Sequence, residues 1–183
     1  MATTVEDIQT NKASQQLRTE GRAGRRAESL AARIEEGAAR LADFAQGLTE
    51  QEWRTPISAT DRRTVGVIVH HVASMYAIEI DLARAVAGGK SVLEVTWDAV
   101  AQINAHHGQE NSQVTKSAAL ALLLQNSRQA AAAVRTFTDQ ELDNAAPLGL
   151  SFGAPMTAQF AIEDHALRHS WHHLAAIRKA LGR

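Results

Sequence analysis

Histidines are the residues of this chain whose type and spacing most directly predict chemistry. Six of the eight histidines form two groups, a C-terminal set and an adjacent pair: His165, His169, His172 and His173, and His70 and His71. Imidazole is the commonest protein ligand for metals, and histidines four residues apart on a helix point the same way. The C-terminal segment is therefore expected to supply half of a metal site, with a further ligand from elsewhere.

The helical wheel of residues 64–87 separates the two adjacent histidines. With Val67 as the origin and about 100° per residue, the apolar side chains fall between roughly 20° and 140°, and they are Ile68, Val72, Met75, Ile78, Leu82 and Val86. His71 falls at about 40°, inside this arc, and His70 near 300°, beside Asp81 and Arg63. We therefore expect His71 to face the core and His70 to face solvent. An unpartnered buried imidazole costs about 1–3 kcal/mol, so His71 needs a partner.

The same wheel sorts the histidines of the last helix. With His165 as the origin, the apolar face spans roughly 120° to 240°, and it contains Phe160, Leu167, Trp171, Leu174, Ile177 and Leu181. His169 falls near 40°, His173 near 80° and His172 near 340°. His169 and His173 are thus nearest the core and can converge on one ion, while His165 and His172 stay outside.

Each of these features has a plainer interpretation. A single inward histidine is more often bonded to a backbone carbonyl than to a metal, and one His-x-x-x-His pair arises by chance. The two features on helices of one bundle together favour a metal site. His107 shares a face with Trp97, Val100 and Ile103, which favours packing, and a place for His106 or His107 at the rim of a pocket stays open.

Composition and periodicity predict an all-α fold. The 183 residues are 45% hydrophobic and 4% aromatic and contain no cysteine, which suits one helical domain and excludes disulfides and thiolate–metal sites. We expect a flexible N-terminal arm over residues 1–25, either a loose segment or a frayed helix, and one domain over residues 26–183. Within that domain, apolar spacing and turn residues predict four long helices at 28–48, 64–87, 115–137 and 157–181. A short helix at 97–107 lies in a long crossover, and residues 144–155 form a loop, which together predict a four-helix bundle.

Charge and hydropathy limit the partners and the location. The formal net charge is −1 and the pI is about 6.7, without the basic face that nucleic-acid binding needs. We find no apolar run long enough to cross a bilayer, and the opening residues 1–16 lack the apolar centre of a secretory signal. We therefore expect a cytoplasmic protein that binds no nucleic acid and no membrane.

Two motifs resemble those of the DinB/YfiT-like superfamily. The run from Thr64 to Val72 looks like its second-helix motif, with an inward histidine seven residues after a Thr-Val start, and the run from His169 to Ile177 is similar to its terminal His-x-x-x-His motif. The likeness covers most of residues 25–181. It implies a DinB-like four-helix bundle with a divalent ion held by His71, His169 and His173. It also implies frequent homodimers and, in some branches, mycothiol-dependent isomerases and thiol S-transferases.

The chain departs from the family pattern at two places. Arg62 and Arg63 stand where members often carry Trp before the Thr-Val start, and Ala175-Ala176-Ile177 stands where members often carry Gly-Gln-Ile. These departures leave the predicted triad intact and bear on the substrate and on the lining of the pocket.

A three-histidine site predicts a catalytic metal, because three protein ligands leave a position for water or substrate. Zinc is the preferred ion, and nickel or iron also suit nitrogen ligands. We expect the ion to activate a low-molecular-weight thiol, such as mycothiol, or water, for transfer to or isomerisation of a small electrophile. Glu79 and Asp164 are the nearby carboxylates that could orient a ligand or move a proton, and a solvated or ion-paired surface role is the favoured alternative for each. The rival functions are a non-catalytic metal- or small-molecule-binding protein and a purely structural role for the histidines.

Overall fold

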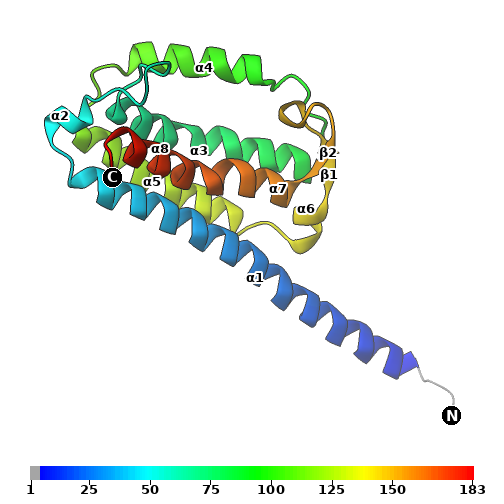
Figure 1. Cartoon of the computed structure of the whole chain (residues 1–183). Coiled ribbons are helices and arrows are strands. Elements are labelled where there is room, and N and C mark those ends of the chain that lie inside the picture. The colour runs from blue at the N-terminus through cyan, green and yellow to red at the C-terminus, as the bar shows by residue number, and fades with distance from the viewer. Residues whose placement is uncertain (1–4) are drawn as a thin grey trace.

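Four long helical segments form the bundle (Figure 1). The computed structural model describes the backbone of residues 5–183 and the side chains of residues 24–183. The bundle helices are α1 (Val5–Gln46), α3 (Val65–Ala87), α5 (Lys116–Val134) and a continuous C-terminal helix made of α7 (Ala158–Ala161), η2 (Ile162–Leu167) and α8 (Arg168–Ala180). The predicted all-α four-helix bundle is confirmed.

Threonines set the starts of the helices that follow α1. In each case the threonine side chain accepts a hydrogen bond from the backbone N–H three residues later, which satisfies a free donor of the first turn. The capping residues are Thr49, Thr64, Thr96, Thr115, Thr138 and Thr157. The predicted starts of the helices near residues 64, 115 and 157 therefore follow from local chemistry.

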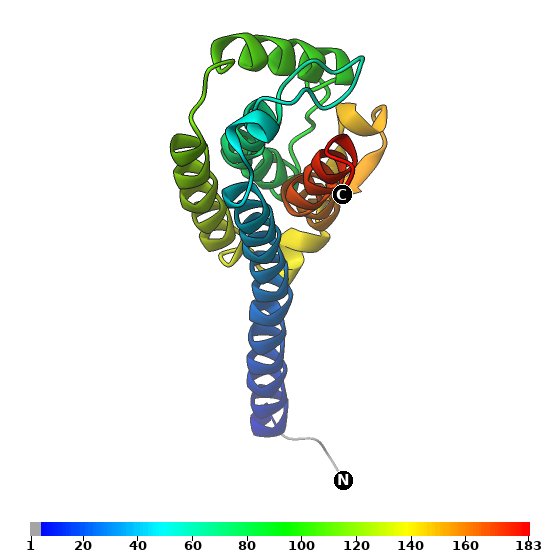
Figure 2. The ribbon, with the colours of Figure 1, turned by 60° about the vertical axis from the view of Figure 1, so that its left-hand side comes forward.

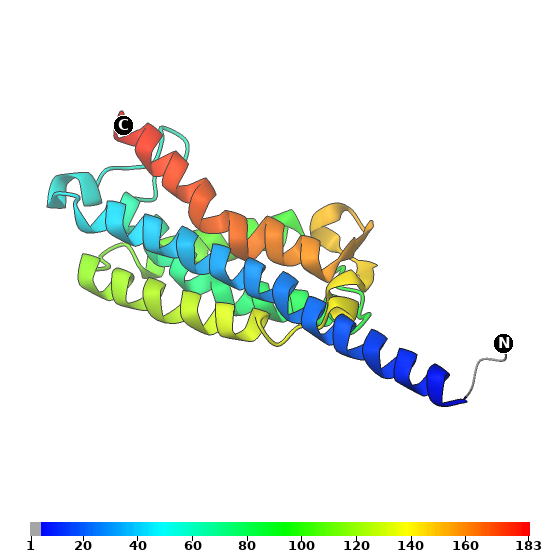
Figure 3. The same cartoon turned by 90° about the horizontal axis from the view of Figure 1, so that it is seen from below.

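The core lies between α1, α3, α5 and the C-terminal helix. Figure 3 shows α1 between α5 and the C-terminal helix, and α5 makes extensive contact with both α1 and α3. Alanines on the facing sides of α1 and α5 are fully buried and let these helices approach closely, among them Ala31, Ala38, Ala119 and Ala131. Larger buried side chains such as Ile34 and Leu123 fill the remaining space.

The crossover from α3 to α5 carries α4 (Trp97–Glu110), which lies outside the bundle above α3 (Figure 1). At its start, the Trp97 indole Nε1 donates to the carbonyl of Leu150 at 2.9 Å. Near its end, His107 Nε2 lies 2.9 Å from His70 Nδ1 on α3. These two contacts fix the direction of α4, whose start lies near Leu150 and whose end lies near His70.

Short elements that the sequence did not predict complete the connections. The connection over residues 49–63 contains α2 (Glu50–Trp53), and α6 (Asp139–Asp143) follows α5. The expected loop at 144–155 holds the antiparallel strands β1 (Ala145–Pro147) and β2 (Pro155–Thr157), joined through the 3₁₀ turn η1 (Gly149–Ser151). Leu150 in η1 is buried, and its carbonyl is the acceptor for Trp97.

The N-terminal helix begins earlier than expected. We expected it to start at Glu28, whereas α1 starts at Val5 and projects beyond the bundle (Figure 2). The side chains of residues 1–23 lie outside the described part of the chain, so the flexible arm over residues 1–25 stays a prediction.

The expectation that no apolar run could cross a bilayer is wrong, because α3 has the length and the composition that a membrane-spanning helix needs. Within the described residues, α3 is the one helix long and apolar enough to do so, and 56% of its most apolar window is buried. The reason for its apolar character is its place in the bundle, where it contacts α5, α7, η2 and α8.

Candidate metal centre

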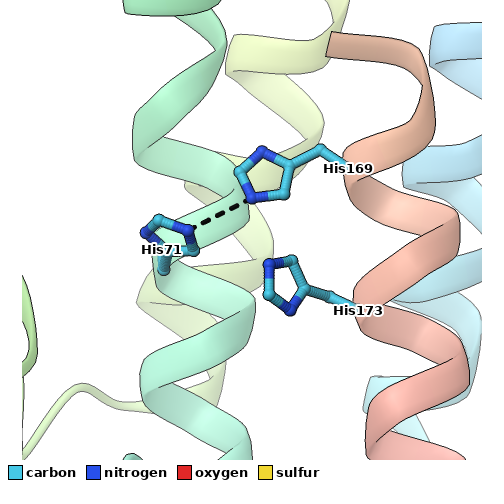
Figure 4. A group of neighbouring side chains, drawn as sticks. All are labelled: His71, His169 and His173. Atoms are coloured by element: carbon cyan, nitrogen blue, oxygen red, sulfur yellow. Dashed lines mark hydrogen bonds between the residues drawn. The ribbon is translucent and has the colours of Figure 1, made fainter. Parts of the chain in front are cut away.

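Three imidazoles from two helices converge in the bundle (Figure 4). His71 comes from α3, and His169 and His173 come from α8. One ligand atom of each residue lies within 4.8 Å of the other two. The Nε2 atoms of His71 and His169 are 3.1 Å apart. Nitrogens bound to one tetrahedral zinc at about 2.0–2.1 Å lie roughly 3.3 Å apart, so small side-chain movements would let these three rings share a cation.

Packing on either side of the histidines fixes the two helices that carry them. Tyr76 on α3 and Ser170 on α8 are fully buried, and their hydroxyl oxygens are 2.7 Å apart. This bond ties α3 to α8 beside His169. On the far side of α8, Trp171 lies against Gly37 of α1, where an added Cβ would come within 2.8 Å of the indole nitrogen. The sequence thus holds α8 between α1 and α3.

Burial keeps two of the three imidazoles neutral. Desolvation, with the neighbouring His169 next in importance, lowers the pKa of His71 to about 2, and the same two causes lower the pKa of His173 to about 2. A neutral imidazole has a free lone pair, which is the form that binds metals. The structure therefore presents these residues in their ligating form at neutral pH.

A buried carboxylate faces the third imidazole. Glu79 Oε1 lies 2.6 Å from His169 Nδ1, and the two side chains are 12% and 13% exposed. The ring N–H is not aligned with that oxygen as in a linear hydrogen bond, but the two atoms are in contact. Metal-binding histidines commonly present their second nitrogen to a carboxylate, which fixes the ring orientation. Glu79 holds His169 with Nε2 directed toward His71.

The three histidines line a cavity of about 490 Å³, within the size range of small-ligand sites. Its walls come from α3, from α4 and the segment before it, from η1, and from η2 with α8. Histidines and charged side chains, among them Asp81, Lys90 and Glu94, line the cavity together with apolar side chains: Met75, Ile78, Leu82, Val92, Val95, Trp97, Val100, Ile103 and Leu150. The candidate metal centre is therefore open to a small molecule.

Comparison with known proteins identifies the family. The sequence model of the DinB superfamily matches residues 33–177. The chain belongs to the DinB superfamily.

The fold of this DinB-superfamily chain is also found in a solved structure. YfiT from Bacillus subtilis, described as a probable metal-dependent hydrolase with an unusual four-helix bundle topology, superposes with a TM-score of 0.68. The match covers 86% of each chain at 21% sequence identity, and at this identity it shows the fold. No curated protein matches the sequence. The predicted resemblance is confirmed at the level of the family.

The structure corrects the expected position of His165 in this DinB-superfamily chain. We expected this side chain to lie outside, whereas it lines the cavity and its Nε2 atom is buried without a partner. The reason is the π-helical segment η2, which includes His165 and has more residues per turn than the 100° wheel assumes. His172, also expected outside, is exposed at the rim of the cavity.

His70 also differs from expectation. It does not face open solvent but stacks on His107, with ring centroids 5.0 Å apart and a 2.9 Å contact between Nδ1 and the Nε2 of His107. The helical wheel could not show this because α4 covers that side of α3. His107 is 8% exposed, as its packing role predicts, and His106 is exposed and lies 3.1 Å from Glu110.

Other charged residues at the cavity differ in how far the sequence revealed their roles. Asp164 pairs with Arg168 at 3.0 Å, as one of the alternatives for it predicted. Glu79 is not a surface group, because it lies in the wall of the cavity against His169. Arg63, which the sequence showed only as a departure from the family pattern, lines the cavity while its guanidinium binds Asp61 at 2.7 Å. The opposite charge of Asp61 next to Arg63 is the one signal for this pair.

Proposed function

We propose that this DinB-superfamily protein is a divalent-metal-dependent enzyme in which His71, His169 and His173 hold the cation. The observation that carries the proposal is the convergence of one ligand atom from each of these residues beside a cavity of about 490 Å³. Three protein ligands suit a catalytic site because a position stays open for a further group. Zinc is the preferred ion, with nickel and iron as alternatives for an all-nitrogen site.

A divalent cation held by three neutral imidazoles keeps its full charge and would lower the pKa of a thiol or water, so that the nucleophile is available near neutral pH. The residues of the chain supply the surroundings. Glu79 orients His169. Arg63, whose guanidinium pairs with Asp61, contributes a further polar group to the wall of the cavity.

The nucleophile we propose is a low-molecular-weight thiol such as mycothiol, or water. The chain contains no cysteine, so a thiol must come from a small molecule. The reactions that fit are thiol transfer to, or isomerisation of, a small electrophile. The description of YfiT as a probable metal-dependent hydrolase supports the use of water.

A metal-dependence assay across two panels tests this function. One panel joins mycothiol and other small thiols with maleylpyruvate, epoxides and alkylating agents, and the other contains esters and amides. We expect turnover by the zinc-loaded protein that is lost on chelation and in His71→Ala. Metal-loaded protein that turns over nothing in either panel would contradict an enzyme of this kind.

A non-catalytic metal- or small-molecule-binding protein is the second candidate. It is favoured by the state of the two carboxylates that the sequence indicates as candidates, since Glu79 contacts His169 and Asp164 pairs with Arg168. Neither is free to move a proton in this arrangement. Tight metal binding without turnover would support this candidate. The homodimer, the lack of nucleic-acid and membrane partners and the cytoplasmic location stay predictions.

A further inference from the structure

Three large apolar side chains are half exposed because they face the same cavity. Ile78, Trp97 and Ile103 are 51%, 49% and 43% exposed, and all three line the cavity that holds the histidine triad. The helical wheel placed Ile78 in the inward arc, so its exposure shows that α4 does not pack directly on this side of α3. Binding of a ligand over apolar surface of this kind is favourable, because it removes that surface from water.

The apolar residues form two facing stripes. On α3, Met75, Ile78 and Leu82 follow one another at helical spacing away from His71, and on α4 Trp97, Val100 and Ile103 follow one another at the same spacing toward the histidine end. The helices α3 and α4 run antiparallel. Trp97 bonds to Leu150, which packs with Leu82, whereas His107 at the other end of α4 contacts His70. The stripes therefore run side by side from the histidine end of the cavity to the Leu150 end.

The part of the cavity between the two stripes forms an apolar channel, and the length of this channel follows from helix geometry. Leu82 lies eleven positions after His71, which corresponds to about 16 Å along the helix axis at 1.5 Å per residue. The channel is thus longer than a compact substrate requires. Beyond the triad most of its wall is apolar, and Asp81, Lys90 and Glu94 also line the cavity.

We propose that the substrate is an amphiphile, a small molecule whose polar head binds at the triad and whose apolar tail lies between α3 and α4. This inference rests on the proposed function for the position of the head and goes beyond it by naming the class of the tail. The occupant is a small molecule rather than a peptide, because α4 covers the cavity along one side and the volume of about 490 Å³ is that of a small-ligand site.

Binding of alkyl hydroxamates to the zinc-loaded full-length protein tests the inference. The hydroxamate group chelates zinc, and the series from acetohydroxamate to octanohydroxamate changes only the tail. We expect affinity, measured by isothermal titration calorimetry, to rise about threefold for each added methylene that the channel buries. The affinity for octanohydroxamate should then exceed that for acetohydroxamate by a factor of at least about 100.

Two variants and a matched control locate the tail. Ile78→Gln and Ile103→Gln should each weaken octanohydroxamate about tenfold and leave acetohydroxamate unchanged. Leu93→Gln is the control, because Leu93 is 53% exposed like Ile78 but does not line the cavity. All three positions are half exposed, so the substitutions do not disturb the core.

The outcomes separate this inference from the proposed function. Equal affinity for all chain lengths, or equal loss in Leu93→Gln, overturns the amphiphile while zinc-dependent binding of acetohydroxamate upholds the metal site. Failure of the protein to bind zinc, or of every hydroxamate to bind the zinc-loaded protein, overturns the metal site and the inference together.

Discussion

The two sides of α3 are built in different ways. On the core side, Val69, Ala73 and Tyr76 are fully buried within the bundle. On the other side, His71, Met75 and Ile78 line a cavity, and α4 stands apart from the helix it covers. The first side is typical of a helix that stabilises a fold, and the second is typical of a helix that holds a ligand.

Unsatisfied polar groups follow the same division. Among the described side chains, six of the eight buried polar atoms without a hydrogen-bond partner belong to residues that line the cavity, namely Arg63, His71, Glu79, Asn104, His165 and His169. Buried polar groups in folded proteins are almost always paired. Their concentration on one side of α3 indicates that this side is shaped for a ligand at a cost in stability, while the opposite side supplies the stability.

Removing one of the three candidate metal-binding histidines on the cavity side should have the largest effect, which is on zinc affinity. We expect His71→Ala to lower zinc affinity by more than the roughly 100-fold that is typical of a change around the ligands, while the metal-free protein keeps its fold. Metal content by mass spectrometry and zinc affinity by competition with a chelator measure this. His106→Ala, at a side chain that is 72% exposed, is the control and should bind zinc normally. Equal zinc binding by both variants would remove His71 from the site.

Removing a side chain from the core should lower the stability of the fold and leave zinc binding unchanged. Leu123 on α5 is fully buried, and Leu123→Ala should lower the free energy of unfolding by about 2–5 kcal/mol. Urea denaturation of the metal-free protein measures the change. The folded variant should still bind one zinc per chain, and loss of zinc binding below the unfolding transition would show that the two sides of α3 are not separable.

Changing the group that orients a ligand should have a smaller effect. Glu79→Gln removes the negative charge facing His169 Nδ1, and we expect zinc affinity to fall about 10- to 100-fold. Asp81→Asn is the matched control, since Asp81 is an exposed carboxylate on the same helix that also lines the cavity. An equal effect of the two substitutions would show that charge in the cavity, rather than contact with His169, sets the affinity.

The cavity side should also make the stability of the metal-free protein depend on acid. Burial lowers the pKa of His71 and His173 to about 2 from an ordinary value of 6.5. Below pH 6.5 the unfolded chain binds protons that the folded, metal-free protein does not. The free energy of unfolding should therefore be highest above pH 6.5. Below that pH it should decrease by about 1.4 kcal/mol per pH unit for each imidazole.

Denaturation at a series of pH values between 7.5 and about 5 checks this, with His71→Asn compared to His106→Asn. The first variant should lose part of the acid dependence and the second should keep it. An unchanged pH profile in His71→Asn would show that His71 gains its proton as easily in the folded protein as in the unfolded chain.

The contrast between the two sides also explains what the sequence could predict. The main helices were predictable because their apolar spacing is regular and threonines such as Thr64 and Thr115 cap them. The inward position of His71 followed from the same spacing. The position of His165 did not, because a π-helical segment changes the angle per residue without a sequence signal. The half-buried state of His70 depends on α4, whose placement over α3 no local pattern shows.

The most direct measurement is anomalous diffraction at the zinc absorption edge from crystals grown with zinc. The account predicts one peak about 2.0–2.1 Å from a ring nitrogen of each of His71, His169 and His173, with an open position toward the cavity. A peak at other residues, or no peak between these three rings in a zinc-saturated protein, would contradict it.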